Sequence, residues 1–169
     1  MKVWCKSSLC YVEPDMEPGE GEEGKFTLRA VKNGYASCQI LVRSEKSFRI
    51  REIRFEGLEQ VDCRYHFQET IEFDKGRFQD PLSNALQTDV KENYTQSIWV
   101  TVFAGEEGGA GTKEGVIKIV TDLGTFETGL TLVLYNCCIP SNREAAFVTE
   151  YWMNTVNFWF RYPDRKQPD

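Results

Sequence analysis

The sequence predicts an all-β protein, an immunoglobulin-like antiparallel β-sandwich with a short C-terminal helical segment. Short runs rich in β-branched and aromatic residues recur along the chain, with apolar residues at every second position. Glycine, proline and Asn-Gly signals separate these runs. No helical period appears before residue 140. Many short strands joined by turns favour a sandwich over a barrel.

The chain is organised around residues 96–104 (QSIWVTVFA) and residues 116–120 (VIKIV). In the first run Ile98 and its alternate neighbours share one face, while Trp99 and Phe103 lie on the other. A strand that is apolar on both faces is normally covered on both, which indicates a central strand. The glycine-rich residues 105–115 connect the two runs. We therefore expect a β-hairpin with a long loop.

The first half of the chain predicts short strands around an acidic loop. Alternation and turn chemistry define each element, and a parity switch at Arg51-Glu52 predicts a β-bulge or a bend. The elements are a strand at residues 3–12, a solvated acidic loop at 13–24, and a hairpin of residues 26–30 and 36–42 around Asn33-Gly34.

The second half predicts two long strands and one long connection. Residues 61–73 give the cleanest alternation, and residues 126–134 form the last strand after a turn at 122–124. Residues 78–94 are polar, and we expect an irregular connection there.

Length and charge limit the kinds of partner. At 169 residues the chain suits one β-sandwich domain over residues 1–140, followed by an aromatic helical segment and tail, residues 141–169, acting as a linker toward an absent domain. The net charge of −6 argues against nucleic acid. No apolar stretch has membrane-spanning length, and no signal segment is visible. We expect a cytoplasmic protein, or a secreted one if a signal was removed.

The sequence contains no pattern that predicts catalysis, a metal site or a cofactor. His66 is the single histidine, and Cys63 lies three residues away on the opposite face of a regular strand. We expect all six cysteines to be free, small apolar residues. In the glycine-rich loop Gly111-Thr112-Lys113 reverses the order of a P-loop and leads into a strand, so the loop is interpreted as a flexible connection.

The C-terminal piece predicts an amphipathic helix, because aromatic residues recur there at steps of three and four. It either packs on the sandwich or docks on another domain, since large exposed aromatic patches usually mark partner surfaces. The candidate interface residues are Phe147, Trp152, Phe158 and Trp159.

Several segments, taken in order, resemble the N-terminal β-sandwich domain of glycoside hydrolase family 123-like proteins and their uncharacterised relatives. The segments are residues 4–15 (WCKSSLCYVEPD), 30–39 (AVKNGYASCQ), 80–82 (DPL) and 96–102 (QSIWVTV), with Gly111 and Gly115 in the glycine positions that follow. The chain departs from the family pattern at Lys32, where arginine is usual, and at Gly34 and Ala36, where glutamate is usual.

The resemblance implies a non-catalytic accessory domain. In that family the catalytic carboxylates lie in a barrel downstream of the sandwich, so no catalytic residue is carried over. The expected partner is a catalytic barrel in cis or another protein, docked through the aromatic segment. The alternative is a free-standing carbohydrate-binding module with Trp4, Trp99 and Tyr94 as sugar platforms. A third class is a hydrolase that acts alone through Asp or Glu.

Overall fold

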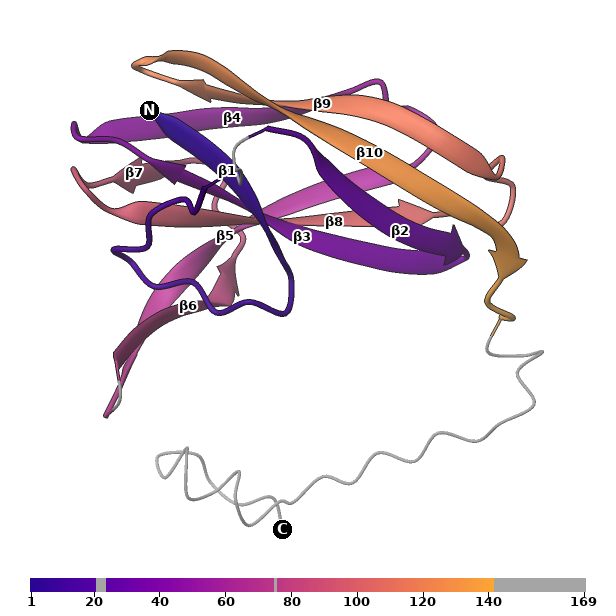
Figure 1. The fold of residues 1–169 in the computed structure, drawn as a ribbon, viewed down its shortest axis with the longest axis horizontal. Helices are drawn as coiled ribbons and strands as arrows, with labels where there is room; N and C mark the ends of the chain where they lie inside the picture. Colours follow the sequence, from indigo (N-terminus) through magenta and orange to yellow (C-terminus); the bar gives the residue numbers. More distant parts are fainter. Residues whose placement is uncertain (21–23, 75, 142–169) are drawn as a thin grey trace, which may run out of the picture. The chain divides into compact units, whose positions relative to one another are not determined.

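The computed structural model describes residues 1–20, 24–74 and 76–141, which form two five-stranded sheets (Figure 1). The two sheets confirm the all-β class and a β-sandwich. The described residues contain no helix, and therefore none that could cross a membrane. The predicted C-terminal helical segment and its four interface residues lie outside the described residues.

Sheet A, in spatial order, consists of β1 (Lys2–Ser7), β3 (Gly34–Arg43), β8 (Thr95–Ala104), β5 (Asp62–Phe73) and β6 (Gly76–Ser83). Sheet B, in spatial order, consists of β2 (Phe26–Lys32), β10 (Gly124–Cys138), β9 (Gly111–Thr121), β4 (Phe48–Glu56) and β7 (Thr88–Val90).

The main core lies between the sheets and is built by alternation. β8 is the middle strand of sheet A, as predicted, and its inward residues Ile98, Val100 and Val102 are fully buried. Leu130 and Leu132 of β10 belong to the same apolar cluster. Burying side chains of this kind is the dominant stabilising term in such a fold.

The predicted hairpin of residues 26–30 and 36–42 is wrong in its pairing. β2 pairs with β10 in parallel, and β3 pairs with β1 and β8, so the chain crosses between sheets at Asn33. Asn33 does adopt the positive φ of 55° that the Asn-Gly signal predicts. The predicted turn is therefore present, but it joins the two sheets. As a result β2 pairs with β10 in parallel.

The long-looped hairpin of β8 and β9 is also absent, because these strands belong to different sheets. β3 and β5 occupy both edges of β8, so β9 has no free edge to pair with there. β9 instead pairs with β10 and β4. The glycine-rich loop thus carries the chain from one layer to the other.

The predicted irregular connection at residues 78–94 was wrong as well, since it contains most of β6 and all of β7. Both strands lie at sheet edges, and each pairs with one other strand of its sheet. An edge strand is half solvated, which allows a polar composition and tolerates Pro81 within β6. For this reason neither strand shows the alternation of apolar residues that predicted the others.

Other local predictions are confirmed. The pairing of β4 with β9 shifts register between Ile50 and Glu52, where the parity switch predicted a bulge. β9 and β10 form a hairpin, and Gly124 in the turn has a φ of 131°. The first strand is shorter than predicted, because β1 ends at Ser7. The following residues 8–16 run across sheet A (Figure 1), where Val12 pairs with Gln79 of β6.

Candidate functional site

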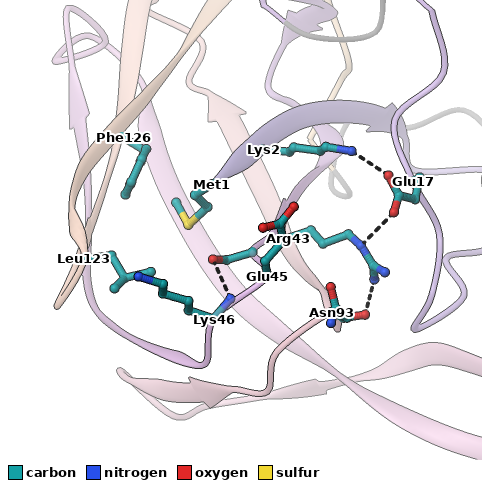
Figure 2. A pocket seen from close by; sticks show the side chains of 10 residues that line it. Met1, Lys2, Glu17, Arg43, Glu45, Lys46, Asn93, Leu123 and Phe126 are labelled. Atoms are coloured by element: carbon teal, nitrogen blue, oxygen red, sulfur yellow. Dashed lines mark hydrogen bonds and ion pairs between the residues drawn. The ribbon is translucent and has the colours of Figure 1, made fainter.

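A hollow of about 560 Å³ opens at one end of the sandwich, where the start of β1 meets the turn after β3 (Figure 2). We call it the end pocket. Its lining includes Met1, Lys2, Glu17, Arg43 and Phe126. The two sheets and the acidic N-terminal loop all contribute to it, so its residues are far apart in the sequence.

In the end pocket the carboxylate of Glu17 is paired with two cationic side chains. Figure 2 shows the Glu17 carboxylate between Lys2 and Arg43. Its oxygens lie 2.5 Å from Nζ of Lys2 and 3.3 Å from Nε of Arg43. The Lys2 hydrogen bond, and then the charges of Lys2 and Arg43, lower the pKa of Glu17. Arg43 also donates to the carbonyl of Asn93. This arrangement anchors the acidic loop to β3.

The outer face of sheet A is the second candidate. Its far end is open to solvent, where Tyr35 of β3 lies opposite Phe103 of β8 with ring centroids 4.6 Å apart. Tyr35 is 73% exposed. Asp62 and Arg64 of β5 line the same end and form an ion pair of 2.6 Å. This half of the face is an exposed aromatic and charged surface.

The near end of the same face is covered by residues 8–16. Gln39 points outward from β3, and its Nε2 donates to the carbonyls of Ser7 and Cys10, both at 2.8 Å. The backbone N–H of Thr95 donates to the carbonyl of Pro14 at 2.7 Å. Polar groups can be buried at low cost only when they are paired in this way. The cover is therefore held by specific hydrogen bonds.

A network of glutamine amides underlies the cover. Gln79 is 2% exposed, and its Oε1 accepts the backbone N–H of Ser97 at 2.8 Å. The backbone N–H of Gln79 donates to the carbonyl of Val12 at 2.9 Å. Gln96 donates to the carbonyl of Gln68 at 2.8 Å. These amides join β5, β6, β8 and the cover into one unit.

A smaller pocket of about 280 Å³ lies where the cover ends, beside Trp99. We call it the Trp99 pocket. One wall is the turn at residues 8–11, and the opposite side is formed by β5, β6 and β8. Trp99 lies between Gln39 and His66 in the register of sheet A and is half-buried. Its indole N–H donates to Oγ1 of Thr101 at 3.1 Å.

The thiols and the histidine do not combine into a site. Cys63 lies on the core side of β5 and His66 on the outer side, as the odd separation predicted. Burial raises the pKa of Cys5 and Cys38, and burial with the Asp62 charge raises the pKa of Cys63 to about 11. These thiols stay protonated at neutral pH. All six cysteines are free, and the described residues contain no metal-binding group.

The predicted site residues fall into different places. Trp4 cannot be a sugar platform, because it is 0% exposed and packs with Val12 and Leu41 under the cover. Tyr94 is half-buried, and its hydroxyl lies 2.6 Å from Oγ1 of Thr70. Trp99 lines the Trp99 pocket. The interface residues Phe147, Trp152, Phe158 and Trp159 lie outside the described residues, so their role stays a prediction.

No protein-family model and no curated protein matches the sequence. Among solved structures, a family 123 glycoside hydrolase from Clostridium perfringens, described in work on glycolipid glycan hydrolysis, superposes with a TM-score of 0.63 at 9% identity. The match covers 82% of this chain and 28% of the hydrolase, so the chain spans little more than a quarter of that protein.

Two further solved structures show weaker likeness. The periplasmic chaperone SfaE gives a TM-score of 0.39 at 6% identity, over 72% of this chain and 60% of its own. The CooA pilin subunit of enterotoxigenic Escherichia coli gives 0.34 at 11% identity, over 81% and 99%. The comparisons establish a β-sandwich related in fold to part of the hydrolase, and nothing finer.

Proposed function

We propose that this chain is a non-catalytic β-sandwich accessory domain of a glycoside-hydrolase-like protein. It would brace or shape a catalytic barrel domain that is supplied in cis or by a partner chain. The observation that carries the proposal is the superposition with the family 123 hydrolase, which covers 82% of this chain but 28% of that one. This proportion is expected when one domain matches part of a larger enzyme.

The sequence supports the same proposal independently. The motifs at residues 4–15, 30–39, 80–82 and 96–102 resemble the N-terminal sandwich of that family in their order along the chain. In the structure they belong to β1 and the cover that follows it, to the β2–β3 crossing, to β6 and to β8, which are all parts of one sandwich. A shared layout of structural motifs favours a shared domain type, although function depends on sites rather than folds.

Several groups that often serve in catalysis are engaged in structure here, which supports a non-catalytic role. Nδ1 of His66 lies 3.3 Å from the carbonyl of Ser83, and the core thiols keep their protons. Lys2 and Arg43 are paired with Glu17. Catalysis would then belong to the partner barrel, and this chain would need no cofactor.

The chain leaves the sandwich from a fixed point, which suits a domain that must present a linker. The N–H of Ile139 donates to the carbonyl of Lys32, and Nδ2 of Asn33 donates to the carbonyl of Ile139, both at 2.9 Å. We infer that the segment that follows reaches toward the barrel, with Phe147, Trp152, Phe158 and Trp159 as its anchors. Aromatic residues in the middle of an interface often carry most of its binding energy.

A variant with alanine at all four anchor positions tests the interface role. If these residues serve a partner, the melting temperature of the isolated chain stays within about 2 °C of the wild type, because the sandwich core is untouched. Binding of a hydrophobic dye falls at the same time, because an exposed aromatic patch is removed. A loss of more than about 6 °C would show that the anchors belong to the core and would contradict the proposal.

An activity assay tests the non-catalytic role separately. The purified chain is expected to release no aryl alcohol from a panel of aryl glycosides. Turnover that persists after repeated purification, and that a single Asp or Glu substitution abolishes, would show that the chain is itself a hydrolase.

A further inference from the structure

The Trp99 pocket has features that neither the fold nor the accessory role requires. Trp99 projects from the outer face of β8, away from the main core, and remains half-buried. Its indole N–H donates to Oγ1 of Thr101, which lies two residues further on the same face of the same strand. This hydrogen bond aligns the indole ring along the strand, so that a flat aromatic surface borders the pocket.

The wall opposite the ring is fixed in place before any ligand arrives. Gln39 holds the turn at residues 8–11 through the carbonyls of Ser7 and Cys10. The N–H of Cys10 closes the turn on the carbonyl of Ser7 at 3.1 Å. The ring of Tyr11 packs against Phe78 of β6, with centroids 5.6 Å apart. Binding of a ligand would therefore cost little conformational entropy, because this wall is already ordered.

The polar groups around the pocket suit hydroxyl groups. The lining includes the exposed carboxylate of Asp80, whereas the amides of Gln39, Gln68 and Gln79 are buried and already bonded within the protein. No Lys, Arg or His is among the lining residues. A site with one carboxylate and no cation disfavours anions, and an exposed carboxylate accepts hydrogen bonds from hydroxyl groups.

We propose that the Trp99 pocket binds the ring of a neutral saccharide. A pyranose has a C–H face that packs on an aromatic ring, and a rim of hydroxyl groups that can donate to the exposed carboxylate of Asp80. The pocket volume of about 280 Å³ lies at the lower end for small-molecule sites, which suits one or two sugar rings. The site requires no barrel, so it goes beyond the accessory role and does not depend on it.

Titration of the full chain followed by NMR tests the site directly. The probes are the methyl glycosides of glucose, galactose, N-acetylglucosamine and N-acetylgalactosamine, with methyl glucuronide as the anionic comparison. At least one neutral probe is expected to shift the indole N–H resonance of Trp99 in a saturable way, with a dissociation constant in the range of about 1 mM, while the glucuronide binds more weakly. No saturable shift with any neutral probe up to about 20 mM, a range well above that constant, would overturn the proposal.

Matched variants locate the binding. Trp99→Ala is expected to weaken binding at least about tenfold, because the stacking surface is lost, whereas Phe103→Ala, on the same face of β8 but outside the pocket, leaves the affinity unchanged. Asp80→Asn is expected to weaken it about threefold without unfolding risk, because Asp80 is exposed. If Trp99→Ala fails to fold, Asp80→Asn and Tyr11→Ala decide the question. Unchanged affinity in these variants would show that the sugar binds elsewhere.

Discussion

The two sheets present different outer faces to their surroundings. On sheet B the outer face carries ion pairs between strands, such as Lys118 of β9 with Glu56 of β4 at 2.8 Å and with Glu127 of β10 at 3.6 Å. On sheet A half of the outer face is buried by residues 8–16, with Trp4 and Leu41 fully enclosed. The face of sheet B is solvated, whereas the covered part of the face of sheet A holds a second, smaller core.

The difference follows from what each face must satisfy. Charged side chains on sheet B keep contact with water and lose little solvation, so the sheet needs no cover. On sheet A the cover brings backbone carbonyls into the interior, and each buried group needs a partner. The Gln39 amide and the backbone N–H groups of Gln79 and Thr95 supply these partners, which makes the cover specific in position. A small pocket remains at its edge, and this is where Trp99 lies.

The largest effect is expected from the amide network. Gln79→Ala would leave the N–H of Ser97 and the carbonyl of Thr95 without their side-chain partner, because both bond to the Gln79 amide. The free energy of unfolding, measured by urea titration, is expected to fall by about 3 kcal/mol. Gln87→Ala, at an exposed position, is the matched control and should leave it unchanged.

A second readout separates loss of the cover from general damage. Hydrogen exchange of the Thr95 N–H, which donates to Pro14, should accelerate more in Gln79→Ala than exchange of the core strands of sheet B. Equal acceleration in both sheets, or a stability loss no greater than in Gln87→Ala, would show that the cover is not held by this network.

The comparison also explains which features the sequence could predict. In β4, β9 and β10 apolar residues alternate regularly, so the bulge in β4 and the turn between β9 and β10 were predicted from local pattern. Pairing partners were not, because Asn33-Gly34 signals a turn equally well whether the chain folds back within a sheet or crosses to the other one. The strands β6 and β7 were missed because edge positions allow polar residues and Pro81.

The candidate site was only partly predictable for a related reason. Trp99 was recognised as an aromatic residue on the second face of β8, and that assignment is confirmed. Its pocket depends on the turn at residues 8–11, whereas the sequence predicted that these residues continue the strand of residues 3–12. Gln39 falls on the polar side of a predicted strand, and Gln79 falls in the predicted irregular connection. Alternation marks which side a residue faces but not what later covers that side.

A smaller effect is expected at the end pocket, where ion pairs of Glu17 hold the acidic loop. The pKa of Glu17 lies below its ordinary value of 4.5, so its pairing stabilises the folded state above that pH and is lost as the pH falls through the lowered value. Glu17→Gln should lower the melting temperature at pH 7 slightly and make its decline between about pH 5 and 3 shallower.

Glu20→Gln, which removes one carboxylate from the same acidic loop, is the matched control for this pH dependence. Its melting temperature should fall with acid as steeply as that of the wild type. Identical profiles for Glu17→Gln and the wild type would mean that the Lys2–Glu17–Arg43 cluster does not hold the loop in solution.

The smallest effect is expected on the open face of sheet B. Lys118→Ala removes the cation that pairs with Glu56 and Glu127, but these acids are about half exposed and can be solvated by water. The melting temperature should change by less than about 2 °C, and the remaining difference should vanish in about 0.5 M NaCl, where exposed charges are screened. A larger, salt-independent loss would mean that Lys118 is desolvated in solution, as it would be if something covered this face too. The contrast between the faces would then fail, because the outer side of sheet B would be a contact surface in its own right.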